Sequence, residues 1–126
     1  MGSCRRVLIV APNPSVADRV IGWASSEGYQ ALVCTDFAEA KPELEARPPD
    51  LLITERKLGA FNGLHLAIRA HSRGLCTPTI IIGEADAQVE EEAHRYQAEY
   101  LAESFEPQTL ETTARAMLAG RYAAAS

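Results

Sequence analysis

Five short apolar runs alternate with segments of helical periodicity along this chain, and this alternation constrains the fold more than any other feature. The expected strands are residues 7–10, 31–34, 51–54, 79–82 and 99–102. A continuous apolar run such as 7–10 is typical of a strand that is buried on both faces. The helices between the strands provide the crossover connections that parallel strands require. The sequence therefore predicts a parallel five-stranded α/β sheet between two layers of helices.

The helices between these strands are marked by apolar spacing and by residues that begin or end a helix. Val16, Val20 and Trp23 recur at helical spacing, and Gly28 is placed to end their helix. Asp86 is a suitable N-cap, and Pro107 stands where a last helix would begin. The expected helices are residues 15–27, 37–46, 63 to about 70, 86 to about 96, and a last helix from 107.

Composition favours one domain, residues 1–126 with a core of about 5–119, and excludes several classes of function. The chain has 126 residues, of which 47% are hydrophobic and 23% charged. Its formal charge is -5 and its basic runs are only pairs, so no nucleic-acid partner is expected. No apolar stretch approaches the roughly 20 residues that cross a bilayer, and no signal peptide is evident. We therefore expect a cytoplasmic protein without a membrane partner.

The cysteines and histidines do not indicate a metal site or a cofactor. The three cysteines are odd in number and widely spaced, so reduced thiols are expected at Cys4, Cys34 and Cys76. Two histidines lie six residues apart on one predicted helix and the third lies on another, which favours surface or packing roles for His65, His71 and His94. The sequence contains no phosphate-binding glycine loop and no nucleophile–base–acid set, so no cofactor is expected.

Four segments together resemble the receiver domain of bacterial two-component response regulators, the CheY-like family. They are VLIVAPNP from residue 7, PDLLITERKLGAFNGL from residue 49, PTIIIGEA from residue 78 and EYLAESF from residue 99. The resemblance covers about residues 7–118. It implies a flavodoxin-like sheet of strand order 2-1-3-4-5, with a functional crevice at the carboxyl ends of the first and third strands. Ala11, Pro12, Asn13 and Glu55 are expected to meet there.

The positions at which this family keeps its reactive residues hold other residues here. The phosphorylated aspartate is replaced by Glu55, and the two acidic residues that hold magnesium are replaced by Ala11 and Pro12. Glu103 stands at the position of the lysine, and Gly83 at that of the small hydroxyl residue. Magnesium needs oxygen ligands, which alanine and proline side chains lack. The resemblance thus predicts a receiver fold that is not an enzyme, binds no metal, does not accept phosphate and signals through protein contacts.

Two further expectations follow from the resemblance. Tyr100 matches an aromatic residue that moves in typical receivers when the hydroxyl residue is drawn to the phosphoryl group. Because Gly83 has no side chain to move, we expect Tyr100 to be a half-buried surface aromatic, with a partner-contact anchor as the alternative. The family's lysine–proline pair, usually joined by a cis bond, is Glu103-Ser104 here. A cis bond without proline costs about 2.5 to 4 kcal/mol, so we expect a trans bond and a reshaped last loop.

Three interpretations of Glu55 remain open from the sequence. In one, Glu55 imitates a phosphorylated aspartate and locks an active-like state. In another, it is solvated or paired with Arg56 or Lys57; if Glu103 lay within about 4 Å, repulsion of about 4 kcal/mol at an effective dielectric near 20 would separate the two acids or raise a pKa. In the third, Glu55, Glu84 and Glu103 supply oxygen ligands for calcium or magnesium.

The family uses the face built from the fourth helix, fifth strand and fifth helix for dimerisation and partner contact. Here residues 86–96, Tyr100 and residues 112–119 form that face. We expect a protein partner there, with a homodimer as one form. Two alternatives are a flavodoxin-like ligand binder or small enzyme that uses the same crevice, and a regulatory domain of a longer regulator.

Overall fold

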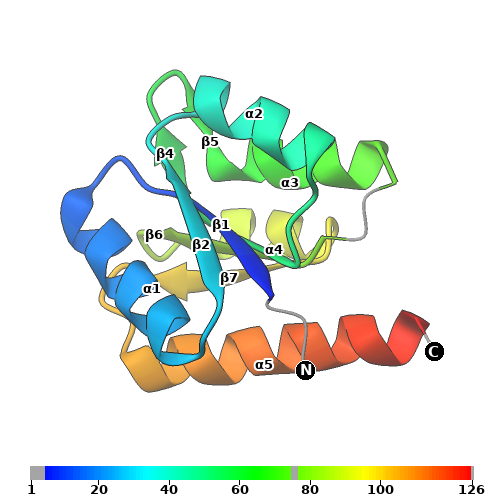
Figure 1. Cartoon of the computed structure of the whole chain (residues 1–126). Coiled ribbons are helices and arrows are strands. Elements are labelled where there is room, and N and C mark those ends of the chain that lie inside the picture. The colour runs from blue at the N-terminus through cyan, green and yellow to red at the C-terminus, as the bar shows by residue number, and fades with distance from the viewer. Residues whose placement is uncertain (1–4, 75–76, 126) are drawn as a thin grey trace.

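The five apolar runs form one parallel sheet in the computed structural model, which describes residues 5–74 and 77–125 (Figure 1). The strands of this sheet are β1 (Arg6–Val10), β2 (Gln30–Cys34), β3 (Leu51–Glu55), β6 (Thr79–Gly83) and β7 (Ala98–Ala102). Their order is β2-β1-β3-β6-β7, with every neighbouring pair parallel. This confirms the predicted α/β fold and the strand order 2-1-3-4-5.

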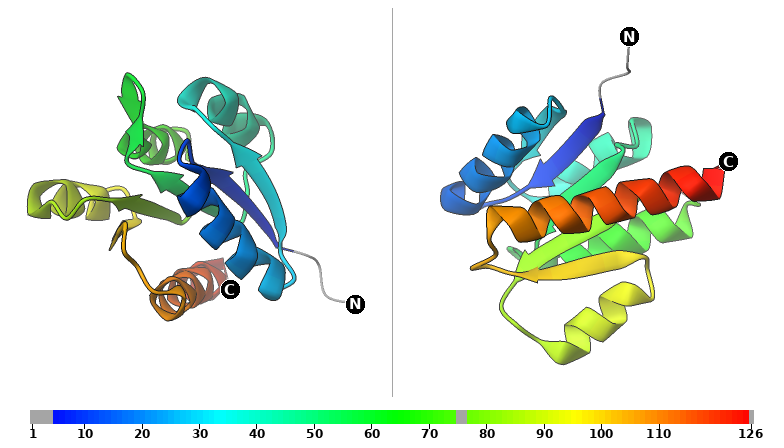
Figure 2. Two further views of the ribbon diagram at one scale, coloured as in Figure 1. Left: turned by 90° about the vertical axis from the view of Figure 1, so that its left-hand side faces the viewer. Right: turned by 90° about the horizontal axis from the view of Figure 1, so that it is seen from below.

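Within the residues that the structure describes, five helices cover the two faces of the sheet. They are α1 (Pro14–Ser26), α2 (Phe37–Ala46), α3 (Gly63–Ser72), α4 (Ala87–His94) and α5 (Pro107–Ala125). Helices α1 and α5 pack on one face, and α2, α3 and α4 pack on the other (Figure 2). The predicted bounds differ from the observed ones by a few residues at most.

Alternation along the strands divides the core between these two faces. In β3, Leu51 and Ile53 belong to the cluster that packs against α1 and α5, whereas Leu52 packs against α2 and α3. Since successive side chains point to opposite faces, Thr54 shares the side of Leu52, and Glu55 shares the side of Ile53. The register of β3 therefore directs Glu55 towards the beginning of α1.

A short hairpin between β3 and α3 was not predicted. It consists of β4 (Lys57–Leu58) and β5 (Phe61–Asn62), which pair antiparallel. Strands of two residues are too short to produce an alternating pattern in the sequence. Gly59 has φ of 64°, a left-handed conformation that glycine adopts without strain and that allows the tight reversal.

The described part of the chain also bears on the thiols and on membrane insertion. Cys34 is buried and forms no disulfide, and burial, together with the nearby charge of Glu39, raises the pKa of its thiol. Cys4 and Cys76 lie outside the described residues. None of the helices in the described ranges is long and apolar enough to cross a membrane.

Candidate functional site

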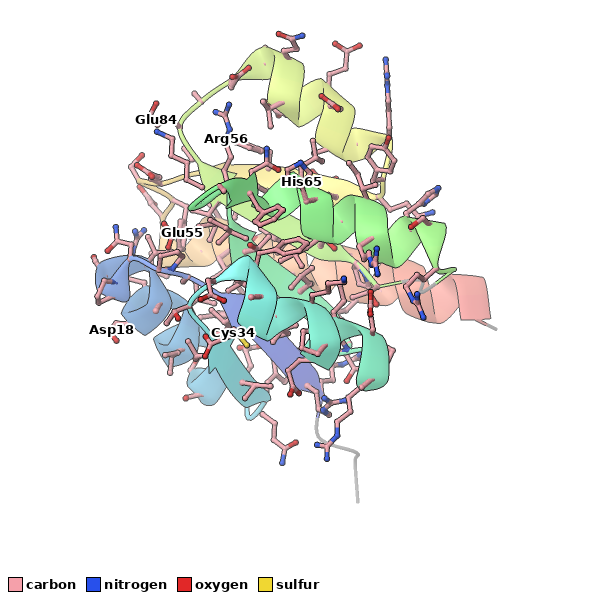
Figure 3. All side chains as sticks on the ribbon, turned by 90° about the horizontal axis from the view of Figure 1, so that it is seen from above. Asp18, Cys34, Glu55, Arg56, His65 and Glu84 are labelled. Atoms are coloured by element: carbon pink, nitrogen blue, oxygen red, sulfur yellow. The ribbon has the colours of Figure 1, made fainter. Side chains whose placement is uncertain are left out.

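The carboxyl ends of β1 and β3 bring Asn13 and Glu55 together. The backbone N–H of Asn13 donates a hydrogen bond of 2.8 Å to Oε2 of Glu55. The Asn13 side chain caps α1 by accepting a hydrogen bond from the Ser15 N–H. The Glu55 carboxylate thus contacts the loop that opens α1, at the edge where parallel strands end (Figure 3).

Glu55 is buried, with 8% of its surface exposed. Desolvation raises the pKa of its carboxyl group, and the negative charge of Glu103 raises it further, while the hydrogen bond from Asn13 opposes both effects. The interpretation in which Glu55 is solvated or paired with Arg56 or Lys57 is wrong. Its hydrogen-bond donor is the Asn13 backbone, and Arg56 pairs with Asp86 instead.

Ala11 and Pro12, at this edge, do not supply the oxygen ligands that would hold magnesium as in the family that the sequence resembles. Ala11 is buried, and its N–H donates to the carbonyl of Cys34 at 2.9 Å, while Pro12 is exposed and carries no oxygen on its side chain. Across residues 5–74 and 77–125, no three acidic, histidine or cysteine side chains gather where they could hold a metal ion. The proposed set of Glu55, Glu84 and Glu103 is therefore not assembled.

Tyr100 occupies the space above Gly83, contrary to the expected half-buried surface position. Only 9% of Tyr100 is exposed, and its hydroxyl donates a hydrogen bond of 2.6 Å to the carbonyl oxygen of Glu84. A Cβ added at Gly83 would lie 2.6 Å from the Tyr100 hydroxyl oxygen and 2.8 Å from Cβ of Arg56, closer than real Cβ atoms approach. The absent side chain at Gly83 is what leaves room for the ring to point inward.

Arg56 connects the end of β3 to the beginning of α4 (Figure 3). Its guanidinium lies 3.3 Å from a carboxylate oxygen of Asp86, the residue that caps α4. Burial raises the pKa of the Tyr100 hydroxyl, and the nearby guanidinium of Arg56 opposes this effect. Sequence reasoning treated Arg56 only as a candidate partner of Glu55.

A second arginine, Arg19 of α1, holds the loop between β7 and α5. Its guanidinium donates hydrogen bonds to the carbonyl oxygens of Glu103, at 2.8 Å, and Phe105. The same group lies 4.0 Å from the centroid of the Phe105 ring, a cation–π contact. No peptide bond in the described ranges is cis, so the Glu103-Ser104 bond is trans, as predicted. Sequence reasoning missed Arg19, whose contacts lie more than 80 residues away.

The fold is similar to that of CheY-like receiver domains in solved structures. A CheY-like response regulator receiver domain protein from Methanospirillum hungatei JF-1 matches with a TM-score of 0.86 at 21% identity, over 95% of this chain and 98% of that chain. The chemotaxis response regulator CheY4 of Vibrio cholerae matches with a TM-score of 0.81 at 20% identity, over 91% of this chain and 99% of that chain. NtrX from Brucella abortus matches with 0.82 at 22%, over 94% of this chain but 27% of that chain. No family model and no curated protein matches the sequence.

The contact between Gly83 and Tyr100 predicts the effect of adding one methyl group. Gly83→Ala is expected to lower the free energy of unfolding by about 1–3 kcal/mol, because the new Cβ overlaps both Arg56 and the Tyr100 hydroxyl. The loss should be smaller in a Tyr100→Phe background, from which the overlapping oxygen is missing. Urea unfolding of the four proteins measures both effects.

Gly22, in the middle of α1, provides a matched control. A Cβ added there meets no atom within 4 Å. Gly22→Ala should therefore stabilise the protein by roughly 0.5–1 kcal/mol through helix propensity. If Gly83→Ala were equally harmless, the close packing of Tyr100 against Gly83 would be disproved.

The buried carboxyl of Glu55 predicts a pH-dependent effect. Because the folded-state pKa of Glu55 is raised, its contribution to stability is complete below the ordinary pKa of glutamate and is lost as the pH rises through the folded-state value. Glu55→Gln removes the buried charge and keeps an acceptor for the Asn13 N–H. It should raise the free energy of unfolding at neutral pH, and the gain should vanish in acid.

Urea unfolding of wild type and variant between about pH 4 and 8 measures this difference, since the ordinary pKa of glutamate, about 4.3, lies at the acid end of that range and the folded-state pKa lies above it. Glu91→Gln, on the exposed surface of α4, is the control and should show no comparable trend. A gain from Glu55→Gln that is the same at every pH would contradict the raised pKa.

Proposed function

We propose that this chain is a receiver-like domain of a bacterial two-component signalling system that does not accept a phosphoryl group. In this proposal it acts as a phosphorylation-independent protein interaction module. The similarity of its fold to response regulators such as CheY4 of Vibrio cholerae supports the signalling class. The side chains at the carboxyl edge of the sheet support the loss of phosphoryl transfer.

The burial of Glu55 carries the proposal. A carboxylate that attacks a phosphoryl donor must be ionised and accessible, and charge on the transferred group must be neutralised by a cation. Glu55 is 8% exposed, its pKa is raised, and its Oε2 already accepts the Asn13 N–H. Glu103 adds a negative charge where the family has a lysine, so the local field opposes the approach of a phosphate.

The inward position of Tyr100 supports signalling without a switch. In the resembling family this ring moves when a hydroxyl residue is drawn to the phosphoryl group. Here the space at Gly83, the carbonyl of Glu84 and the contact with Arg56 hold the ring without any phosphoryl group. Since Glu55 makes no contact in this set, the phosphoaspartate-mimic interpretation is not needed to explain it. The β7 edge beside α4 and α5 is thus presented in one constant form.

The surface of α4 favours a partner with basic contacts. Glu90, Glu91 and Glu92 are consecutive and exposed on this helix. Tyr100 is only 9% exposed, which disfavours a role as a contact anchor for a partner. A complementary basic surface would speed encounter with α4 and select among partners.

A second candidate is that the domain regulates a longer protein. NtrX from Brucella abortus has this fold in about a quarter of its chain, because the match covers 27% of it. That relation shows that the fold occurs as one part of a larger protein. In such a protein, the same face of α4, β7 and α5 would contact the neighbouring domain.

Binding of a phosphoryl analogue tests the proposed function. With beryllofluoride and magnesium, we expect no saturable change in the amide chemical shifts of Ala11, Asn13, Glu55 or Gly83. The physical reason is that, within the part of the chain that the structure describes, no three acidic, histidine or cysteine side chains gather to hold the metal. Localised, saturable shifts would refute the loss of phosphoryl transfer.

A gain-of-site variant is the matched control. Replacing Ala11, Pro12 and Glu55 together with aspartate restores three carboxylates at the ends of β1 and β3. If the backbone has kept the receiver geometry, this variant should show magnesium-dependent shifts at these positions, whereas wild type should not. Failure of both proteins to respond would mean that the backbone, as well as the side chains, has left the receiver arrangement.

A further inference from the structure

The outer edge of β2 lacks the features that usually protect a strand edge. The sheet ends at β2, which lies in front of β1 between α2 and α1 in Figure 1. Leu32 is 44% exposed and Val33 38%, although both are large and apolar. The strand reads QALVC, with no charge, proline or glycine. Natural proteins usually block such edges with charges, prolines or bulges, because an open edge pairs readily with another strand.

The opposite edge of the same sheet is protected. β7 has the sequence AEYLA and includes the exposed Glu99. Oε1 of Glu99 lies 3.6 Å from Nε2 of His94 in α4. A charged side chain on an edge strand disfavours pairing with another strand. The two edges therefore differ in the feature that controls pairing, and only the β2 edge is suited to it.

We infer that β2 pairs antiparallel with β2 of a second copy of this chain, about a two-fold axis at Leu32. The two sheets would then form one continuous sheet across the dimer. In this register Gln30 lies opposite Cys34, Ala31 opposite Val33, and Leu32 opposite its own copy. Because β2 contains no charged residue, the pairing brings no like charges opposite each other.

The direction of the backbone hydrogen bonds in β2 is compatible with this register. The N–H of Gln30 donates to Arg5 and the carbonyl of Cys34 accepts from Ala11, so both residues direct their backbone groups towards β1. By strand alternation, Leu32 does the same, and Ala31 and Val33 direct theirs outward. An antiparallel copy would pair Ala31 with Val33 through both N–H···O bonds. Leu32 would then face Leu32 in the closer, non-hydrogen-bonded position, where side chains touch.

The charges of α2 complement this arrangement. α2 starts beside the end of β2, where Asp36 and Glu39 lie near Cys34. It ends beside the start of β2, where Arg47 and Gln30 line one cavity of about 280 Å³. None of Asp36, Glu39 and Arg47 forms an ion pair with a residue of the described ranges. A two-fold axis would place Asp36 and Glu39 of one copy towards Arg47 of the other. Arg6 lines the same cavity as Arg47 and adds positive charge there, and Glu43 offsets part of it.

This inference does not rest on the proposed function. The β2 edge is at the opposite side of the sheet from β7, so the dimer would leave the face of α4, β7 and α5 free. Pairing of one short strand buries little surface, so the dimer should be reversible and concentration-dependent.

Analytical ultracentrifugation over a range of protein concentrations tests the inference. Wild type should show a monomer–dimer equilibrium. Leu32→Lys places two charges on the axis and should raise the dissociation constant at least about tenfold. Glu99→Lys introduces the same side chain on the β7 edge and should leave the constant unchanged. A monomer at every concentration, or a dimer that survives Leu32→Lys, would overturn the inference.

Disulfide trapping provides a second measurement that does not depend on affinity alone. In an antiparallel, non-hydrogen-bonded pair the Cα atoms lie about 4.5 Å apart, which suits a disulfide. With Cys4 and Cys76 replaced by serine, Leu32→Cys should form a covalent dimer under mild oxidation. Glu99→Cys in the same background should form far less. Equal trapping of both variants would mean random collision and would contradict pairing through β2.

Discussion

The absence of a side chain at Gly83 organises the whole carboxyl edge of the sheet. Because nothing projects from this residue, the Tyr100 ring turns inward and its hydroxyl reaches the carbonyl of Glu84. Arg56 packs its Cβ over the same glycine and extends its guanidinium to Asp86, the cap of α4. The space left at Gly83 thus allows the contacts of Tyr100 and Arg56, which connect the ends of β3, β6 and β7 to the start of α4. A larger residue at this position would have to displace a side chain on either side.

Glu55 is a buried carboxylate in an electrostatically unfavourable environment. Burying a carboxylate is unfavourable, and the neighbouring charge of Glu103 increases the penalty. One backbone N–H from Asn13 compensates in part. No cation among the groups that shift the pKa of Glu55 offsets the charge, so the site favours the neutral acid compared with a solvated glutamate. This property supports the proposal that the edge does not accept a phosphoryl group.

The fold could be predicted from the sequence because its signals are local and repeated. Apolar runs such as 51–54, and caps such as Asp86 before α4, each mark an element without reference to distant residues. The site could be predicted only in part. The buried position of Tyr100 depends on space left by Gly83, which lies on a neighbouring strand, and the contacts of Arg19 cross from α1 to the loop after β7. The partners of long side chains such as Arg56 depend on tertiary structure. Adjacency in sequence therefore gave the wrong partner for Glu55, because Arg56 pairs with Asp86.

The two edges of the sheet are chemically different, and this difference has a consequence for signalling. A protein interaction module with one constant surface binds a partner only as strongly as that surface allows. A dimer through β2 would carry two copies of the α4, β7 and α5 face, both left free by the pairing. If a partner offered two sites at a matching distance, binding of the second copy would be intramolecular and the overall affinity would rise without any new contact. Because the dimer is expected to be reversible, the local concentration of the chain would then control the strength of the interaction in place of a phosphoryl group.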